Sequence, residues 1–265
     1  MMMLRALGSN HDVRNARARL AAFRARVDNR LARHFRTKLH RLPAGQPMVS
    51  LTFDDIPDSA AEVGAPLVEA HGGRATFYVS GGLLQRWSGH WRGSDEAGII
   101  ALHARGHEIA CHTFSHPRVT DIAPATLRAE IAENGRYLTG LDASMRLDNF
   151  AYPYGLASLS HKHFLADTFR SSRGILPGVN RDVVDLQFLR ATPLVSIHID
   201  RDGVDRVFDD LMASGSWLIF YSHDVAERPS PHGCTPDLLR HALKAASRRK
   251  LPIVTVAEAL DRAGV

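Results

Sequence analysis

The chain has 265 residues, of which 45% are hydrophobic and 23% are charged, so it can bury a sizeable core and is not a disordered, collagen-like or multi-span membrane protein. Only two of its residues are cysteines, which excludes a fold held together by a framework of disulfide bonds. The net charge of +5 divides into +9 over residues 1–42 and −4 over the rest, which excludes nucleic-acid binding as the role of the whole protein.

The first expected element is a helix over residues 11–40. Its apolar residues recur at spacings of three and four and form one stripe: Leu20, Phe23, Val27, Leu31, Phe35 and Leu39. Arginines occupy most of the other positions. This pattern indicates a helix that packs on the domain or on a second copy of the chain, or one that lies on an anionic membrane surface.

No signal peptide or membrane span is expected from the sequence. Arginines interrupt the N-terminal region every few residues, and no stretch approaches the roughly 20 apolar residues that cross a bilayer. We therefore expect a cytoplasmic protein, or one that is peripheral at the inner membrane.

From Pro47 onward, expected strands alternate with expected helices. The strands are Met48–Phe53, Arg74–Val79, His107–Cys111, Phe150–Tyr152, Thr168–Ser171, Phe188–Ile199, Trp217–Tyr221 and Ile253–Thr255. The helices are Ser59–His71, Ser94–Ala104, Pro124–Leu138, Leu156–Ala166, Val204–Ser214, Thr235–Arg249 and Val256–Ala263. This order predicts an α/β fold with a parallel sheet, either a barrel or a doubly wound sheet.

Metal-capable and proton-capable groups follow directly after four apolar runs. In both α/β architectures, functional groups gather where parallel strands end. His112 and His116 have the i, i+4 spacing that places two imidazoles on one side of a helical turn, where they can share a metal. Asp54 and Asp55 point to opposite sides of an extended backbone, so one can bind the metal while the other contacts water. His223 follows another strand and is a candidate acid.

Four motifs together resemble those of the polysaccharide deacetylases (NodB-homology domain, carbohydrate esterase family 4). They are TFDD at Thr52–Asp55, HTFSH at His112–His116, YPYG at Tyr152–Gly155 and SHD at Ser222–Asp224. The resemblance covers roughly residues 47–260. It implies a distorted (β/α) barrel of about seven strands over residues 47–265, preceded by a basic amphipathic helical extension over residues 1–46.

The resemblance also implies roles for single residues. Asp54 matches the general base, Tyr154 the residue whose backbone N–H helps to form the oxyanion hole, and His223 the general acid. A divalent metal, most often Zn²⁺, is implied as the cofactor. Its implied ligands are Asp55, His112 and His116.

The sequence departs from the family pattern in two places. The family often has Arg where this chain has Ala151, and that Arg steadies the catalytic base; Arg190 is a candidate substitute by its position. The usual Leu three residues before the catalytic His is Phe220 here. Asp185 is a candidate for the acidic residue that tunes that His. Three loop residues are candidates for lining a sugar-binding groove: Trp87, Trp91 and His232.

Three functions follow from this interpretation. The first is a metal-dependent hydrolase that removes an N-acetyl group from an amino sugar or polysaccharide precursor in surface-polysaccharide metabolism. The second is a deformylase or another C–N amide hydrolase acting on a lipid- or nucleotide-linked sugar. The third is a non-catalytic sugar-binding relative. The expected partners are an N-acylated sugar and, through the N-terminal helix, the inner-membrane surface or a second copy of the chain.

Overall fold

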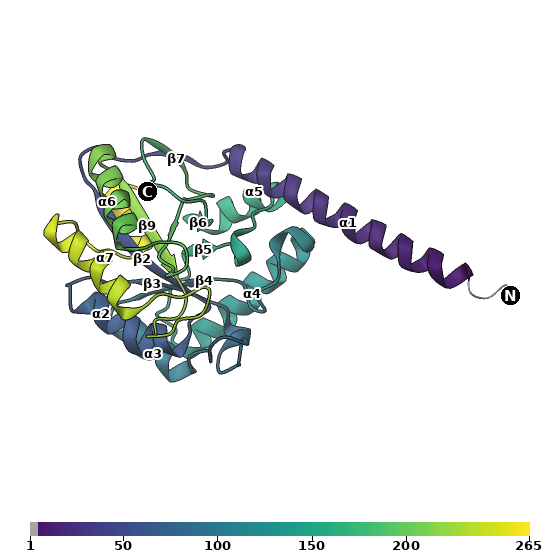
Figure 1. Cartoon of the computed structure of the whole chain (residues 1–265), viewed down its shortest axis with the longest axis horizontal. Helices are drawn as coiled ribbons and strands as arrows, with labels where there is room; N and C mark the ends of the chain where they lie inside the picture. Colours follow the sequence, from purple (N-terminus) through teal and green to yellow (C-terminus); the bar gives the residue numbers. More distant parts are fainter. Residues whose placement is uncertain (1–4) are drawn as a thin grey trace.

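The computed structural model describes residues 5–265, and its centre is one curled sheet of seven strands (Figure 1). Neighbouring strands run parallel throughout, in the order β6-β5-β4-β3-β2-β9-β8. The strands are β2 (Met48–Asp54), β3 (Thr76–Val79), β4 (Glu108–Cys111), β5 (Asn149–Ala151), β6 (Ser171–Arg173), β8 (Thr192–Pro193) and β9 (Trp217–Ser222). The sheet and its helices confirm the (β/α) barrel fold.

Helices connect the strands and cover the outside of the sheet. They are α1 (Arg5–His34), α2 (Ala65–Glu69), α3 (Glu96–Ala104), α4 (Pro124–Leu141), α5 (Leu159–Thr168), α6 (Arg201–Ser214), α7 (Pro236–Arg248) and α8 (Val256–Ala263). Short turns of 3-10 or π helix lie at η1 (Ala60–Gly64), η2 (Gly81–Leu83), η3 (Val119–Asp121) and η4 (Pro153–Gly155).

The core lies between the sheet and its helices. All seven residues of β2 are buried, as expected for a central parallel strand that is covered on both faces. Phe53 of β2 stacks on Phe77 of β3 with ring centroids 5.3 Å apart. This packing fixes the point at which β2 ends, and the polar residues that follow it emerge at one edge of the sheet.

Several expected boundaries differ from the observed ones. The first helix ends at His34, and Leu39 lies in a short strand, β1 (Leu39–Arg41), that pairs antiparallel with β7 (Val183–Asp185). Ile253 makes only a single bridge to Val49, so the expected last strand is absent from the described residues. These short segments have too few residues for a periodic pattern, and their pairing depends on distant partners.

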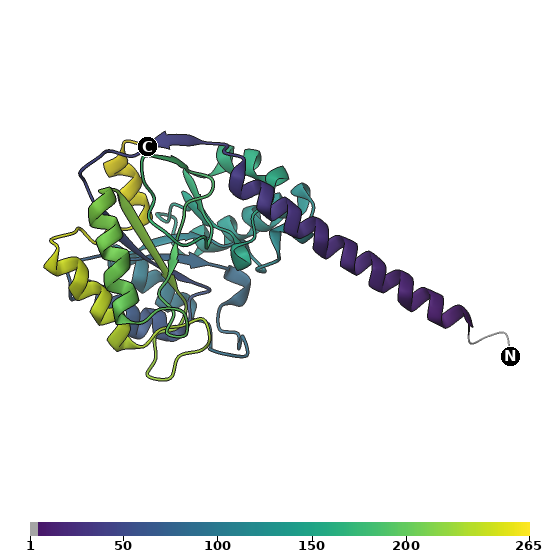
Figure 2. The same ribbon diagram turned by 45° about the horizontal axis from the view of Figure 1, so that its top comes forward.

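The helix α1 attaches to the barrel by its polar residues. Asp28 and Asn29 accept hydrogen bonds from the backbone N–H groups of Leu159 and Ala157, at 2.9 and 3.0 Å. Lys162 donates to the carbonyl oxygen of Ala32 at 2.9 Å. Beyond this contact, α1 projects from the body in both views (Figures 1 and 2).

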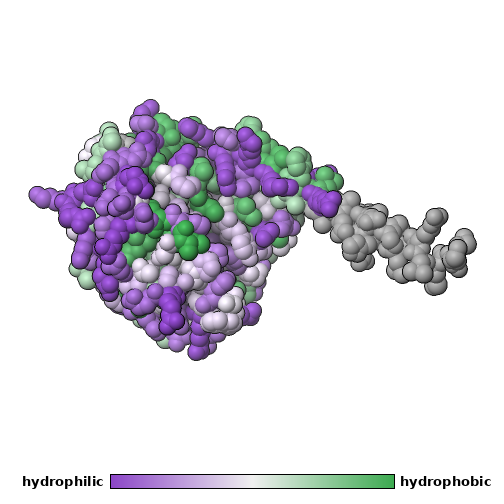
Figure 3. Space-filling view, viewed as in Figure 1, coloured by the Kyte–Doolittle hydropathy of each residue, from purple (hydrophilic) through white to green (hydrophobic). Residues whose placement is uncertain are grey.

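The apolar side chains of the N-terminal region face outward. The six residues of the predicted stripe, which we call the α1 stripe although Phe35 and Leu39 lie just beyond α1, are between 39% and 59% exposed, so the stripe does not pack on the barrel. Figure 3 shows apolar and polar side chains side by side along the coloured part of α1. Within residues 5–265, no helix combines the length and the apolar character that crossing a membrane requires.

Candidate metal centre and active site

The paired carboxylates sit where β2 ends. Asp54 is the last residue of the strand and is 4% exposed. Asp55 and Ile56 follow in left-handed conformations, with φ of 61° and 42°. Such conformations are costly for residues other than glycine, and they cluster at functional sites. The turn sends the two carboxylates in different directions, as the expectation of two separate roles requires.

The two histidines come together by a different route from the expected one. Residues 112–116 form an irregular loop rather than a helical turn, and Thr113 and His116 have φ of 63° and 59°. Glu130 of α4 holds this loop, since its carboxylate accepts hydrogen bonds from the backbone N–H groups of Phe114 and Ser115 at 3.0 and 2.7 Å. The imidazole centroids of His112 and His116 lie 4.8 Å apart.

Asp55, His112 and His116 form a set with metal-binding geometry. Their ligand atoms all lie within 4.8 Å of one another. Oδ1 of Asp55 lies 3.4 Å from Nε2 of His116 and 3.8 Å from Nε2 of His112. The Nδ1–H of His112 donates to the carbonyl oxygen of Ala151 at 2.8 Å, so the lone pair of its Nε2 faces the carboxylate.

The chemistry of this set fits a divalent cation. Oδ1 of Asp55 is buried and accepts no hydrogen bond from a described residue. A carboxylate oxygen next to imidazole lone pairs is repulsive unless positive charge lies between them. Two imidazoles and one carboxylate are a common catalytic ligand set for zinc and leave a position for water.

The electrostatics of the set favour metal-ready protonation states at neutral pH. Burial lowers the pKa of His112 to about 3 and that of His116 to about 4, so both imidazoles are neutral. Burial also raises the pKa of Asp55 to about 6, so this carboxyl is ionised only above that pH. The pKa of Asp54 shifts in the opposite direction, because this carboxylate has a cationic partner.

Arg173 is the cationic partner of Asp54. Its Nη2 lies 2.5 Å from Oδ1 of Asp54, and the guanidinium lies over the ring of Tyr78. Burial alone raises the pKa of Asp54, but the charges of Arg173, His112 and His223 and the hydrogen bond from Arg173 together outweigh this effect, so the pKa lies below its ordinary value. Asp54 therefore stays ionised.

The strand register explains how Arg173 replaces the missing Arg. Arg173 of β6 is the register partner of Ala151 on β5. The guanidinium is thus supplied from the next strand at the same level of the sheet. The expectation that Arg190 fills this role is wrong: its side chain is exposed and donates to the carbonyl oxygen of Pro177 at 2.9 Å.

The expected tuning of His223 by Asp185 is also wrong. Asp185 forms an ion pair with Lys162 and accepts hydrogen bonds from the backbone of Thr37 and Lys38, near β1. Instead, Nδ1 of His223 donates to the carbonyl oxygen of His232 at 3.2 Å. This bond fixes the proton on Nδ1 and leaves Nε2 for proton exchange with a ligand.

These side chains line one cavity of about 500 Å³. The cavity contains Asp54, the three candidate ligands, Tyr154 and His223, so the structure brings together all six residues that the sequence singles out. Trp91 and His232 also line it, whereas Trp87 is 70% exposed and does not. The ring centroid of Trp91 lies 5.4 Å from that of His223.

Tyr154 has an unusual backbone conformation. Its φ of 56° and ψ of 11° break the short helical turn η4. The phenol ring is half exposed, and its centroid lies 4.5 Å from that of His116. The backbone at this residue therefore has a fixed orientation beside the candidate metal ligands.

Sequence reasoning misses Arg173, Glu130 and Ile175 in or around this site. Ile175 lines the cavity, and Glu130 holds the histidine loop. Arg173 carries little signal, because it lies two residues beyond the expected strand Thr168–Ser171 and follows serines rather than apolar residues. Glu130 reads as one of many exposed helix residues.

The chain is similar to known proteins in sequence and in fold. The family model for polysaccharide deacetylases matches residues 41–167. The chitin deacetylase of Colletotrichum lindemuthianum is 24% identical over 200 residues, which cover 71% of this chain and 74% of that protein. The peptidoglycan deacetylase PdaC of Bacillus subtilis superposes with a TM-score of 0.55 at 18% identity, covering 82% of this chain and 91% of the other.

A further structural neighbour is BA3943 of Bacillus anthracis, a pseudoenzyme of carbohydrate esterase family 4. It superposes with a TM-score of 0.61 at 14% identity and covers 86% of this chain and 70% of its own. The matched range 41–167 contains Asp54, the three candidate metal ligands and Tyr154. Residues 41–167 of the chain match the polysaccharide deacetylase family, and the chain shares the fold of solved structures of carbohydrate esterase family 4.

Proposed function

We propose that this protein is a metal-dependent N-deacetylase of an N-acetylated amino sugar or a polysaccharide precursor built from one. The observation that carries the proposal is the convergence of Asp55, His112 and His116 beside the Asp54–Arg173 pair in one cavity. Deacetylases among the relatives, such as the chitin deacetylase, support the reaction class.

Asp55, His112 and His116 are the residues that would hold the metal. A divalent ion supplies Lewis-acid chemistry when bound: it lowers the pKa of water and polarises an amide carbonyl. Zn²⁺ is the proposed ion because two imidazoles with one carboxylate suit it. The hydrogen bond from His112 to Ala151 orients the first of these ligands before any ion arrives.

Asp54 is the proposed general base. Arg173 keeps its carboxylate ionised and fixes its direction, so Asp54 can accept a proton from the attacking water. A base held in this way loses no free energy to reorientation at the moment of reaction. Arg173 itself touches no reacting atom and is a positioning residue.

Tyr154 and His223 complete the proposed machinery. The backbone N–H of Tyr154 is proposed to donate to the oxyanion of the tetrahedral intermediate of amide hydrolysis. His223, with its Nδ1–H donating to the carbonyl of His232, is proposed to receive a proton on Nε2 and to pass it to the leaving amine. The products are a carboxylate, acetate for an N-acetyl group, and a free amino sugar.

Metal content and acetate release test this proposal together. We expect zinc-loaded protein to release acetate from N-acetylated chitooligosaccharides, and chelation to abolish the release until zinc is restored. His116→Ala should lose both bound zinc and acetate release, while His163→Ala, which removes an exposed histidine of α5, should lose neither. Acetate release that persists at full rate without bound metal would contradict the proposal.

Two other functions stay as outcomes of the same assay. Formate release from N-formylated sugars, or ring opening of a cyclic amide, without acetate release would favour an amide hydrolase of different acyl specificity. Binding of N-acetylated sugar without turnover by the zinc-loaded protein would favour a non-catalytic relative, and BA3943 shows that the family includes a pseudoenzyme.

We also propose that the α1 stripe is a contact surface. Its outward-facing apolar residues and the neighbouring arginines support this proposal. Salt-sensitive co-sedimentation with anionic vesicles would favour an inner-membrane contact, and a concentration-dependent dimer in analytical centrifugation would favour a second copy. A Phe23→Ser variant that behaves like the wild type in both measurements would contradict the proposal. The cytoplasmic location and the division at residue 46 stay predictions.

A further inference from the structure

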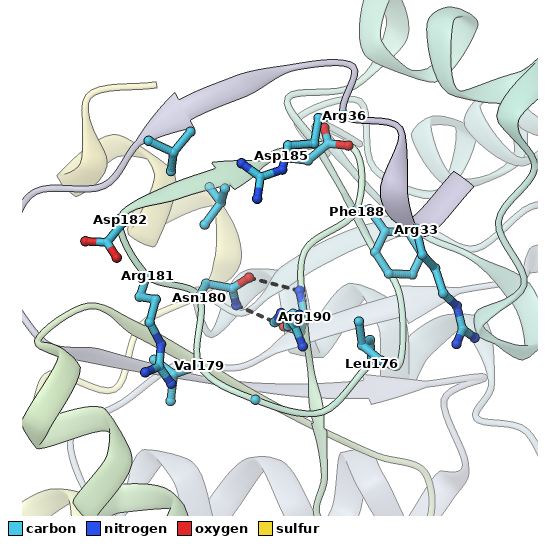
Figure 4. Close-up of a pocket in the computed structure, with 13 residues that line it drawn as sticks. Arg33, Arg36, Leu176, Val179, Asn180, Arg181, Asp182, Asp185, Phe188 and Arg190 are labelled. Carbon is cyan, nitrogen blue, oxygen red and sulfur yellow. Dashed lines mark hydrogen bonds between the residues drawn. The ribbon is translucent and has the colours of Figure 1, made fainter. Parts of the chain in front are cut away.

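A second cavity adjoins the active-site cavity along the chain, because Ile175 lines the first and Leu176 lines the second. Its volume is about 630 Å³, and it opens between the end of α1 and the segment 176–190 (Figure 4). Arg33, Arg36 and Arg190 line it. The same three arginines also line an adjoining hollow of about 480 Å³, which Arg26 and Arg30 border as well. We call Arg33, Arg36 and Arg190 the arginine cluster.

The arginine cluster lacks compensating negative charge. None of its three members forms an ion pair with any residue among 5–265 for which contacts are described. Nε of Arg33 is buried and has no hydrogen-bond partner there. Arg181, which lines the same cavity, already pairs with Asp210 at 2.6 Å.

The two acidic residues in the lining do not neutralise the cluster. Asp185 is engaged by Lys162 and by the backbone N–H groups of Thr37 and Lys38. The carboxylate of Asp182 turns away from Arg36 and Arg190 in Figure 4. The cavity is therefore lined by the three arginines of the cluster and by no carboxylate that is free to neutralise them.

The surrounding backbone holds Arg190 in place. Its Nη1 donates to the carbonyl oxygen of Pro177 at 2.9 Å, and its backbone N–H and carbonyl bond the side chain of Asn180, both at 2.9 Å. A side chain fixed in this way loses little conformational entropy when it binds a ligand. The cluster combines one pre-positioned guanidinium with two others that arrive from a separate element.

We propose that the arginine cluster binds the phosphate or pyrophosphate group of a ligand. Guanidinium groups match the geometry of phosphate oxygens and bind them through pairs of hydrogen bonds. Three such groups carry more positive charge than one carboxylate can balance, whereas a pyrophosphate offers several negative oxygens. A phosphate bound there would supply the negative charge and the hydrogen-bond acceptor that the buried Nε of Arg33 lacks.

The proposed phosphate site is separate from the metal centre. Ile175 lines the candidate active site, and the next residue, Leu176, lines the arginine cavity. No member of the arginine cluster lines the active-site cavity. Phosphate binding and amide hydrolysis can therefore be measured independently, and the proposal does not depend on the proposed catalytic function.

Titration of the full-length protein with inorganic pyrophosphate tests the proposal. We expect saturable binding in calorimetry, about tenfold weaker in Arg36→Gln and at least about 100-fold weaker when all three arginines are changed to Gln. Pyrophosphate held by a metal ion at Asp55 would survive these substitutions. Arg36 is exposed, so Arg36→Gln keeps the test valid even where the triple variant unfolds.

A matched control separates a site from general attraction of anions. Arg240→Gln removes the same charge from the exposed face of α7 and should change pyrophosphate affinity by less than about twofold. Equal weakening by Arg240→Gln and Arg36→Gln would overturn the proposal. Unchanged affinity in the triple variant would also overturn it. So would the absence of saturable binding both to pyrophosphate and to vesicles that contain phosphatidic acid.

Vesicles distinguish the source of the phosphate group. Phosphatidylcholine vesicles with and without phosphatidic acid present the same chemistry on a lipid. Retention on the phosphatidic acid vesicles that the triple variant abolishes would support a lipid headgroup as the ligand. Binding of soluble pyrophosphate alone, abolished in the same way, would support a water-soluble phosphate compound. In both cases Arg36→Gln should leave acetate release from an uncharged chitooligosaccharide unchanged.

Discussion

The candidate metal centre and the arginine cluster line two cavities, and the unbalanced charges in these cavities have opposite signs. In the first, a buried carboxylate oxygen of Asp55 faces imidazole lone pairs, and a cation is what the geometry lacks. In the second, a buried nitrogen of Arg33 has no hydrogen-bond partner among the described residues and the other two arginines of the cluster line the same cavity, so an anion is what is lacking. By contrast, Asp54 and Arg173 neutralise each other inside the protein. The comparison teaches that an ionisable group marks a binding site when its partner is missing, and a positioning pair when its partner is present.

The largest expected effect comes from removing the ionised oxygen of Asp54. Asp54→Asn keeps the shape of the side chain but cannot accept a proton, so kcat for acetate release should fall by about 10² to 10⁴-fold. Zinc content should stay at the wild-type level, because Asp54 is outside the ligand set. Loss of zinc in this variant, measured by elemental analysis, would show that the separation of roles between the two carboxylates is wrong.

Breaking the neutral pair should destabilise the fold. Arg173→Met leaves the carboxylate of Asp54 buried without its partner, which is expected to lower the free energy of unfolding by about 3–5 kcal/mol. Denaturant titration measures this change. The double variant Asp54→Asn/Arg173→Met should recover a large part of the loss, because no buried charge is left alone. A single variant as stable as the wild type would contradict the buried pair.

Removing the charge of Asp55 from the metal centre should instead stabilise the chelated protein. Burial raises the pKa of Asp55 from 3.8 to about 6. Because the folded chelated protein holds this proton more tightly than the unfolded chain, its free energy of unfolding falls as the pH rises from about 4 to 6. At about 1.4 kcal/mol per pKa unit, Asp55→Asn should be more stable than the wild type by about 3 kcal/mol above pH 6, and nearly equal to it at pH 4.

Zinc is the control for that comparison. It should stabilise the wild type and leave Asp55→Asn almost unchanged, which reverses the order of their stabilities. The measurement is thermal or denaturant unfolding at several pH values with and without zinc. If Asp55→Asn is the less stable protein throughout, even after chelation, the carboxylate has a partner that the geometry does not show.

The smallest expected effect concerns repulsion within the arginine cluster. At low salt and without phosphate, changing Arg33, Arg36 and Arg190 to Gln should raise the free energy of unfolding by up to about 1 kcal/mol, because like charges are removed. The difference should vanish in about 1 M salt, where charges more than about 3 Å apart are screened. A triple variant that is less stable than the wild type at low salt would indicate that these arginines already have partners.

Much of the fold follows from sequence periodicity, but the short elements do not. The buried run Met48–Phe53 and the helix Thr235–Arg249 correspond closely to β2 and α7. The pair β1 and β7 has three residues in each strand, too few for a pattern, and it forms only because distant segments meet. The same reason explains why the expected strand Ile253–Thr255 is reduced to one bridge.

The sequence by itself determined the chemical inventory of the site. Two carboxylates, two histidines and a third histidine follow apolar runs, and parallel strands bring their ends to one edge of a sheet. Those facts require no coordinates. They bring two histidines and one of two carboxylates within reach of one ion. The resemblance to polysaccharide deacetylases selects Asp55 as that carboxylate, and the structure shows the ligand atoms of Asp55, His112 and His116 within 4.8 Å of one another.

Only the tertiary structure decided which charges are paired. The replacement of the missing Arg by Arg173 depends on the register between β5 and β6, and the register is a property of strand pairing that spacing along the chain does not reveal. The outward direction of the α1 stripe has a similar cause. Asp28 and Asn29 bind the backbone at the start of α5, so these polar contacts, together with the buried Ala32, set the rotation of the helix.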